Sequence, residues 1–205
     1  MNYQFPIIKT IDDVLPALEG RDEFIVAPRD GFTVINYNVG FEDTFTIDVN
    51  DLMDNYGTMI PKGLMRRECR GLFFDADGKL ISRPLDKFFN VGEREETLFY
   101  NIDMSRPHKI YTKLDGSMIR PVFINSSLRW CTKMGITDVG LQVEQYISKN
   151  LHYVDFANWA IDNQLTLIFE FTSPNNRIVI SYDEDILTLL AVRENITGNY
   201  LPITS

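Results

Sequence analysis

The pattern of apolar and polar positions predicts short β-strands over most of the chain. Residues 32–37 are rich in β-branched and aromatic side chains, as strands usually are. Residues 71–74 and 79–83 flank the pair Asp77-Gly78, a sequence typical of a hairpin turn. In the last third of the chain, strands are predicted at residues 165–171, 177–182 and 186–192.

Residues 109–133 are predicted to hold three more strands, separated by turns at Asp115-Gly116 and at Asn125-Ser126-Ser127. Helices are fewer. A short one is predicted over residues 10–18, where Thr10 and Asp13 have the spacing of a helix start and Pro16 weakens the end. Apolar residues recur at helical spacing in two further segments, at 139–147 behind Thr137-Asp138 and at 156–160.

Strands with helices inserted between them predict an α+β fold with antiparallel sheets. The 205 residues, 44% of them hydrophobic, are enough to bury a core, and we expect one domain over residues 1–205. This composition fits no class of disordered, collagenous or membrane protein, no secretory signal is visible, and the cytoplasm is the expected compartment. Four residues, Cys69, Cys131, His108 and His152, lack the spacing of a disulfide framework or metal site.

The formal net charge of −9 argues against non-specific nucleic-acid binding by a generally basic surface. It still allows a local basic cleft. If cationic side chains from several strand ends converge in the fold, they form a phosphate site inside an acidic protein; taken singly, each is an ordinary solvated strand end. The candidates are Lys62, Arg66, Arg67, Arg70, Arg83, Lys87, Arg120, Arg129 and Lys133.

The segment Lys113-Leu114-Asp115-Gly116 has the pattern K-x-D-G and carries the clearest chemistry. A lysine amine attacks phosphorus only when neutral, so it needs burial or neighbouring cations. An acid two residues later can bind a metal or a sugar hydroxyl, and glycine lets the backbone approach a nucleotide closely. The alternative is a hairpin whose Asp-Gly turn joins two strands.

Further segments supply groups that a reaction at a nucleotidyl-lysine needs. Glu170 is a lone acid among apolar strand residues, where a carboxylate is costly unless it is paired or bound. Lys133 ends the strand after K-x-D-G, Lys87 precedes two phenylalanines, and Arg70 offers a bidentate fork for phosphate. The alternative for each is a role in folding or solubility.

Together these segments resemble the phage RNA ligase 1 family, within the superfamily of covalent nucleotidyltransferases that includes DNA ligases and mRNA capping enzymes. The resemblance spans about residues 30–200, and the succession is far more specific than any one motif. It implies a nucleotidyltransferase domain of the ligase type, related to ATP-grasp. The motifs are Glu68-Cys69-Arg70-Gly71, residues 82–90, residues 112–117, Phe169-Glu170-Phe171 with residues 174–179, and residues 189–195.

The resemblance makes Lys113 the residue that accepts AMP from ATP. Arg70, Lys87 and Lys133 would neutralise phosphate charge, and Mg²⁺ would bridge the triphosphate. The family then transfers AMP to a 5′-phosphate RNA end, and a 3′-hydroxyl displaces the AMP to seal the strand. Repair of cleaved tRNA in the cytoplasm of an infected bacterium is the role that it suggests. Nucleotide or phosphate contacts fall on Tyr37, Arg70, Lys87, Phe89 (near the base), Asp115, Gly116, Lys133 and Glu170 (at a ribose hydroxyl or the metal).

Two motifs of the family, E-G-x-V and K-x-K, are not found after Glu170. We therefore expect the N-terminal adenylyltransferase portion of a ligase, or a shortened relative, without a C-terminal RNA-specificity domain. Such a chain is expected to bind ATP weakly, to form little lysyl-AMP and not to seal RNA. The alternatives are a DNA ligase, a capping-type enzyme that uses GTP, or a non-catalytic module that binds nucleotides or RNA ends.

Overall fold

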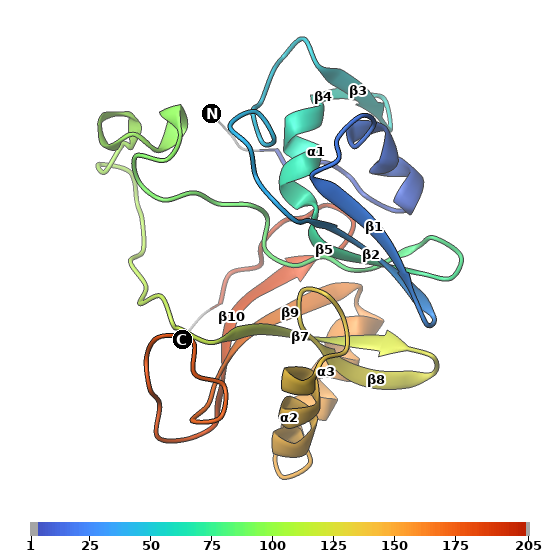
Figure 1. The fold of residues 1–205 in the computed structure, drawn as a ribbon, viewed down its shortest axis with the longest axis vertical. Coiled ribbons are helices and arrows are strands. Elements are labelled where there is room, and N and C mark those ends of the chain that lie inside the picture. The colour runs from blue at the N-terminus through green and yellow to red at the C-terminus, as the bar shows by residue number, and fades with distance from the viewer. Residues whose placement is uncertain (1–3, 204–205) are drawn as a thin grey trace.

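The computed structural model describes residues 4–203, which form two four-stranded sheets and a separate two-stranded hairpin (Figure 1). In chain order the elements are the 3₁₀ turns η1 (Ile11–Asp13) and η2 (Leu15–Ala17), β1 (Phe24–Arg29), β2 (Phe32–Tyr37), β3 (Leu52–Asn55), β4 (Thr58–Pro61), α1 (Lys62–Glu68), β5 (Arg70–Asp75), β6 (Leu80–Ser82), η3 (Glu95–Thr97), η4 (Phe99–Asn101), β7 (Ser117–Ile124), β8 (Ser127–Cys131), α2 (Asp138–Ile147), α3 (His152–Asp162), β9 (Leu165–Thr172) and β10 (Ile186–Glu194).

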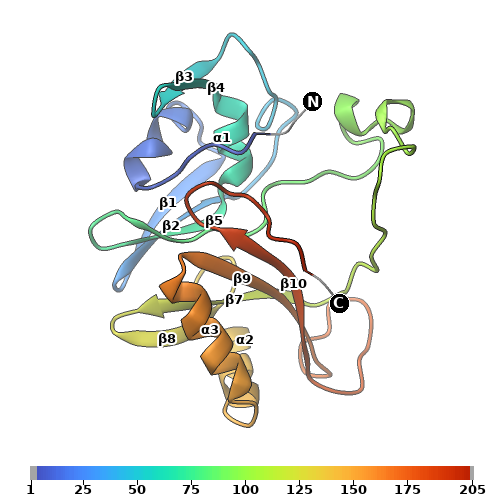
Figure 2. The same ribbon diagram turned by 180° about the vertical axis from the view of Figure 1, so that it is seen from behind.

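The first sheet has the strand order β1-β2-β5-β6, and the second has the order β10-β9-β7-β8. All their pairs are antiparallel, which confirms the predicted α+β class with antiparallel sheets. The two sheets lie one above the other, with α1 outside the first and both α2 and α3 outside the second (Figures 1 and 2). Within residues 4–203, no helix combines the length and the apolar character needed to cross a bilayer.

The first sheet buries both of its faces. On β2, Val34 packs toward the second sheet together with Phe73, whereas the next residue, Ile35, packs toward α1 together with Leu72. Because side chains alternate between the two faces of a strand, a strand buried on both faces is a continuous apolar run. The predicted hairpin around Asp77-Gly78 is confirmed as β5 and β6, with Gly78 in the left-handed region that its turn requires.

The second sheet is covered on its outer face by the two predicted helices. Thr137 caps α2 by accepting a hydrogen bond from the backbone N–H of Gly140. The β7–β8 hairpin turns at Asn125 and Ser126, which both have positive φ, as a tight hairpin demands. The buried residues Val143, Ile147, Ala157 and Ala160 of the helices share one core with Trp130, Phe169 and Phe171 of the strands.

Three predictions of secondary structure are wrong. Residues 10–18 form two 3₁₀ turns rather than one helix, and Pro16, which lacks an N–H, lies in the second turn. Residues 109–116 form no strand, so Asp115-Gly116 is not a hairpin turn but the entry to β7. Residues 177–182 belong to an irregular loop between β9 and β10, here called the 173–185 loop.

A buried ion cluster joins the two sheets. Glu68, at the end of α1, accepts hydrogen bonds from Arg83 over 3.0 Å and from Arg193 over 2.8 Å, and all three side chains are fully buried. Arg83 follows β6 of the first sheet, whereas Arg193 belongs to β10 of the second. The two guanidinium groups hold the pKa of Glu68 below its usual value, against the opposing effect of burial.

Of the nine candidate cations, five therefore have partners away from any common cleft, and a sixth, Arg67, is buried with its guanidinium 4.9 Å from the ring centre of Phe89. Arg83 is part of the ion cluster, and three others are buried: Arg66 and Arg67 donate to the backbone carbonyls of Thr44 and Phe45, and Arg120 donates to that of Gly71. Near the surface, Lys62 pairs with Asp51 and Arg129 with Glu144. Sequence position could not reveal these partners, because most of them are distant along the chain.

Candidate active site

The K-x-D-G segment lies against Glu170 of β9. The backbone N–H of Gly116 donates to Oε1 of Glu170 over 3.0 Å, and the next residues, Ser117 and Met118, pair with Phe171 and Glu170 in the β7–β9 ladder. A Cβ at position 116 would lie 2.2 Å from the carbonyl oxygen of Phe171. Glycine is therefore required here by the close approach of two backbones.

Lys113 lies three residues before Gly116, in irregular backbone, with its side chain exposed. Its positive charge acts in the lowering direction on the pKa of Asp115 in the same segment and on the pKa of Glu170 on β9. The carboxyl of Glu170 is half-buried, and this burial raises its pKa above the usual value; the N–H of Gly116 and the charge of Arg70 act in the opposite direction. Glu170 is thus near both Lys113 and Arg70.

Arg70 begins β5 in the facing sheet. Its Nη1 donates to the carbonyl of Asp86 over 3.3 Å, and its guanidinium lies 4.7 Å from the ring centre of Phe88. Lys133, which follows β8, lies with Nζ 5.1 Å from the ring centre of Tyr37. Burial lowers the pKa of Lys133, and the nearby charge of Arg70 lowers it further.

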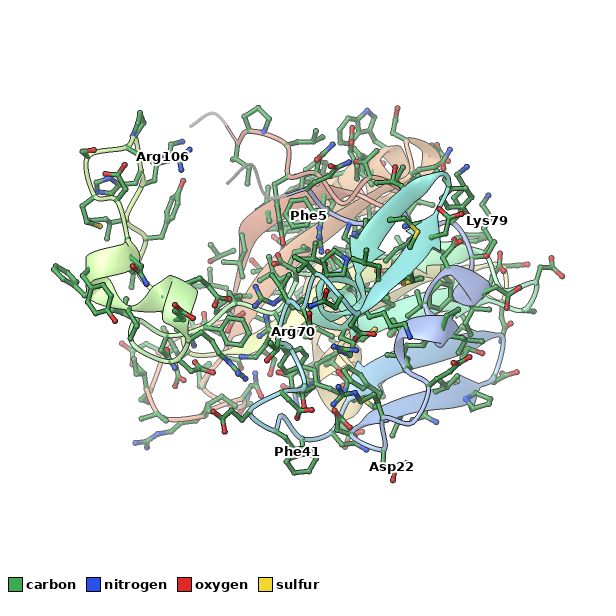
Figure 3. The ribbon with its side chains drawn as sticks, turned by 90° about the horizontal axis from the view of Figure 1, so that it is seen from above. Phe5, Asp22, Phe41, Arg70, Lys79 and Arg106 are labelled. Atoms are coloured by element: carbon green, nitrogen blue, oxygen red, sulfur yellow. The ribbon has the colours of Figure 1, made fainter. Side chains whose placement is uncertain are left out.

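Lys87 and Phe89 adjoin the same group. The Nζ of Lys87 lies 4.4 Å from the ring centre of Phe89, whose ring also faces the guanidinium groups of Arg67 and Arg94. Burial lowers the pKa of Lys87, Glu93 acts in the opposite direction, and the positive charge of Arg70 lowers it again. Arg70, which lies in the body of the molecule in Figure 3, is therefore the common neighbour of these groups, because its charge acts on Lys87, Lys133 and Glu170.

Asp115 has a contact that the sequence did not predict. Its Oδ2 accepts hydrogen bonds from the backbone N–H groups of Val179 and Ile180, each over 2.6 Å, and its own N–H donates to the hydroxyl of Tyr182 over 3.0 Å. The two N–H groups hold the pKa of Asp115 below its usual value. One carboxylate oxygen thus holds the 173–185 loop rather than pointing freely to a ligand.

A second contact attaches the same loop to β7. Nδ2 of Asn176 donates to Oγ of Ser117 over 2.9 Å. A sequence signal exists here, since Asn176 belongs to the segment after Glu170 that carries the family resemblance, but nothing local showed that its partner lies 59 residues away. Asn176 and Tyr182 are therefore site residues that sequence reasoning missed.

Two cavities lie elsewhere, and neither is lined by Lys113 or by any residue to which the resemblance assigns a nucleotide or phosphate contact. One, of about 260 Å³, lies between Arg29 and Arg129, and the other, of about 420 Å³, adjoins the β5–β6 turn. In the described part of the chain, no three His, Cys, Asp or Glu side chains are close enough to hold a metal together. A metal bound at Glu170 would therefore need other ligands, such as the phosphates of a nucleotide.

Comparison with known proteins points to one family. A family model described as RNA ligase matches residues 68–204. A protein named "Putative RNA ligase" from Thermovibrio ammonificans is 28% identical over 194 residues, which are 94% of this chain and 47% of that protein. The "Putative bifunctional polynucleotide kinase/RNA ligase" of Autographa californica nuclear polyhedrosis virus is 33% identical over 157 residues, which are 65% of this chain and 22% of that protein.

"RNA ligase 1" of bacteriophage TS2126 is 27% identical over 143 residues, which are 66% of this chain and 36% of that protein. The family model covers well over half of the sequence, and the chain therefore belongs to the RNA ligase family. It spans about half the length, or less, of the relatives that it matches.

Proposed function

We propose that this chain is the adenylyltransferase portion of an ATP-dependent RNA ligase, with Lys113 as its nucleophile. The observation that carries the proposal is the 3.0 Å hydrogen bond between Gly116 and Glu170, which fixes the K-x-D-G segment beside a half-buried carboxylate. Glu170, on β9 of the second sheet, then lies close enough to both Lys113 and Arg70, the first residue of β5 in the other sheet, for their charges to act on it. Phosphoryl chemistry needs this combination of a positioned nucleophile and preorganised charge.

The proposed reaction has three displacements. Nζ of Lys113 loses a proton and attacks the α-phosphorus of ATP, so that a P–N bond forms, the α–β P–O bond breaks and pyrophosphate leaves. An oxygen of an RNA 5′-phosphate then attacks the same phosphorus, which breaks the P–N bond and returns the electron pair to the lysine. Finally, a 3′-hydroxyl attacks the activated 5′-phosphorus, and AMP leaves as the strand is joined.

The residues around Lys113 have separate roles in this scheme. Arg70, Lys87 and Lys133 offset the phosphate charge, and partial burial strengthens their effect because little water screens them. Phe89 lies near the base, and Glu170 accepts from a ribose hydroxyl or contacts the metal. Asp115 acts through the 173–185 loop that it holds.

Magnesium fits this arrangement only as a companion of the nucleotide. Mg²⁺ is commonly held by one or two carboxylates together with substrate phosphates, and Glu170 is a half-buried carboxylate close enough to Lys113 for the lysine charge to act on it. Asp115 is already engaged by two backbone N–H groups. When bound, the ion supplies charge that offsets the triphosphate, while the side chains of this chain orient the amine and hold the phosphates.

The test is covalent labelling of the whole chain. Wild type and Lys113→Ala are incubated with ATP and magnesium for hours, because the sequence predicts slow labelling, and intact mass is measured after denaturation. We expect a gain of one AMP on wild type alone, and peptide mapping to Lys113. GTP in a parallel sample distinguishes a ligase from a capping-type enzyme.

Lys149→Ala is the matched control, since Lys149 is an exposed lysine just after α2. It should label like wild type. Equal labelling of Lys113→Ala, or ATP binding without any covalent AMP, would overturn the proposal, and the second result would favour the non-catalytic binding module.

A further inference from the structure

The two sheets are joined by a projecting segment, residues 98–113, which we call the arm. In Figure 1 it runs outside the body of the molecule before it enters β7, and Figure 3 shows Arg106 far out on it. The hydrogen bonds that the structure gives to residues 98–112 all stay within residues 95–108. Residues 98–112 of the arm therefore form no hydrogen bond with either sheet, although the arm leads directly to Lys113.

The arm exposes large rings that a folded chain normally buries. Phe99, Tyr100 and Tyr111 are 74%, 80% and 77% exposed, and Ile110 is 85% exposed. None of the three rings packs against another ring in the described residues. Exposed apolar groups on this scale indicate a binding surface.

The charge of the arm identifies the class of ligand. Residues 103–113 are all exposed and carry three cations, Arg106, Lys109 and Lys113, against a single carboxylate, Asp103. This is opposite in sign to the whole chain, whose net charge is −9. Cations interleaved with exposed aromatic rings are the features by which proteins bind single-stranded nucleic acid, with phosphates on the cations and bases stacked on the rings.

We propose that the arm binds single-stranded RNA and brings it to Lys113. This inference rests on the proposed function, in which an RNA end must reach that lysine. Tyr111 lies two residues from Lys113, so a base stacked on its ring would hold the adjoining phosphate close to the amine. A duplex would bind less well, because its bases are already stacked on one another.

The test measures binding of a short, 5′-phosphorylated, fluorescent single-stranded oligoribonucleotide to the full chain by anisotropy. Tyr111→Ala should weaken binding about fivefold or more, as loss of one stacked base does. Arg106→Ala/Lys109→Ala should reduce the slope of log affinity against log salt by about 0.7 for each phosphate that is no longer neutralised. A duplex of the same sequence should bind more weakly than the single strand.

Two controls make the same chemical changes elsewhere. Phe123→Ala removes a ring that is 52% exposed on the β7–β8 hairpin, and Arg29→Ala/Lys149→Ala removes two exposed cations. Both should bind RNA like wild type. The proposal is overturned if the arm variants also bind like wild type, or if they change only self-association in light scattering, which would assign the arm to a protein partner.

The same samples keep this inference separate from the proposed function. Lys113→Ala should retain most of the RNA affinity that Tyr111→Ala loses, while lysyl-AMP formation is measured independently by mass. RNA binding through the arm without any lysyl-AMP would refute the proposed function alone. Lysyl-AMP formation with arm-independent RNA binding would refute the arm alone.

Discussion

The hydroxyl of Tyr182 accepts the backbone N–H of Asp115 over 3.0 Å and so joins the 173–185 loop to the K-x-D-G segment. Tyr182→Phe leaves that N–H without its partner, at a cost of about 1 kcal/mol. We expect lysyl-AMP formation to slow about fivefold, with a smaller change in ATP affinity, because the backbone that presents Lys113 is less fixed. Single-turnover labelling and equilibrium ATP binding measure the two effects.

Tyr56→Phe is the matched control for this prediction. It removes a hydroxyl that donates to Asp13 over 2.8 Å, on the separate β3–β4 hairpin. The two variants should lose similar stability, but only Tyr182→Phe should slow labelling. Equal slowing in both would show that the hydroxyl of Tyr182 contributes stability and nothing more.

The raised pKa of Glu170 predicts a pH dependence of stability. A carboxyl whose pKa is higher in the folded state binds more protons there than in the unfolded chain, so stability falls as pH rises from about 4.3 through the folded pKa. Glu170→Gln keeps an oxygen for Gly116 but removes the titration. Chemical denaturation at several pH values should show a smaller fall for the variant across this window, and an unchanged profile would contradict the burial of the charge.

Glu68→Gln should strongly destabilise the protein. It removes the charge that compensates two fully buried arginines, and breaking a buried ion group by removal of one partner costs about 3–5 kcal/mol. Urea unfolding measures the loss. Glu144→Gln, which breaks the partly exposed pair with Arg129, should cost about 1 kcal/mol or less, and a similar loss in both variants would be inconsistent with the cluster.

Gly116→Ala should disturb the site directly. The added methyl would lie 2.2 Å from the carbonyl oxygen of Phe171, so β7 and β9 must separate and the hydrogen bond to Glu170 must lengthen. Labelling of Lys113 should fall by about tenfold or more, because the amine is no longer held in line with the phosphorus. Gly92→Ala, where no atom lies within 4 Å, should cost only about 1–2 kcal/mol for its positive φ and leave labelling unchanged.

The elements that the sequence predicted well are those with strong local signals. Asp77-Gly78 and Asn125-Ser126 specify tight turns by their own backbone preferences, and the α2 helix has both a cap and a helical apolar period. β1 was missed because Pro28 and Arg29 interrupt an otherwise apolar run. The strand predicted at 109–114 failed for the opposite reason, since Ile110 and Tyr111 favour strands locally but have no neighbouring strand to pair with among the described residues.

In the candidate site, too, the sequence indicated residues within motifs but not the contacts between segments far apart in the chain. Motif order selected Lys113, Glu170 and the cations Arg70, Lys87 and Lys133, and the structure connects them through the charge of Arg70, which acts on Lys87, Lys133 and Glu170, and that of Lys113, which acts on Glu170. Motif order could not separate these cations from Arg83 or Arg120, because burial depends on contacts between segments far apart in the chain. It also could not show that Asp115 is held by backbone N–H groups of the 173–185 loop, since a backbone donor has no sequence signature.

The cluster of Glu68, Arg83 and Arg193 also predicts that the two halves of the chain stay associated after proteolytic cleavage of the arm. The strands of the first sheet all precede the arm and those of the second all follow it, so one cut after an exposed arm residue such as Lys109 divides the molecule between the sheets. The ion cluster and the apolar contact of Val34 and Phe73 with Val122 would still hold the halves together. A nicked protein should therefore elute from a sizing column as one particle and fall into two fragments only in denaturant.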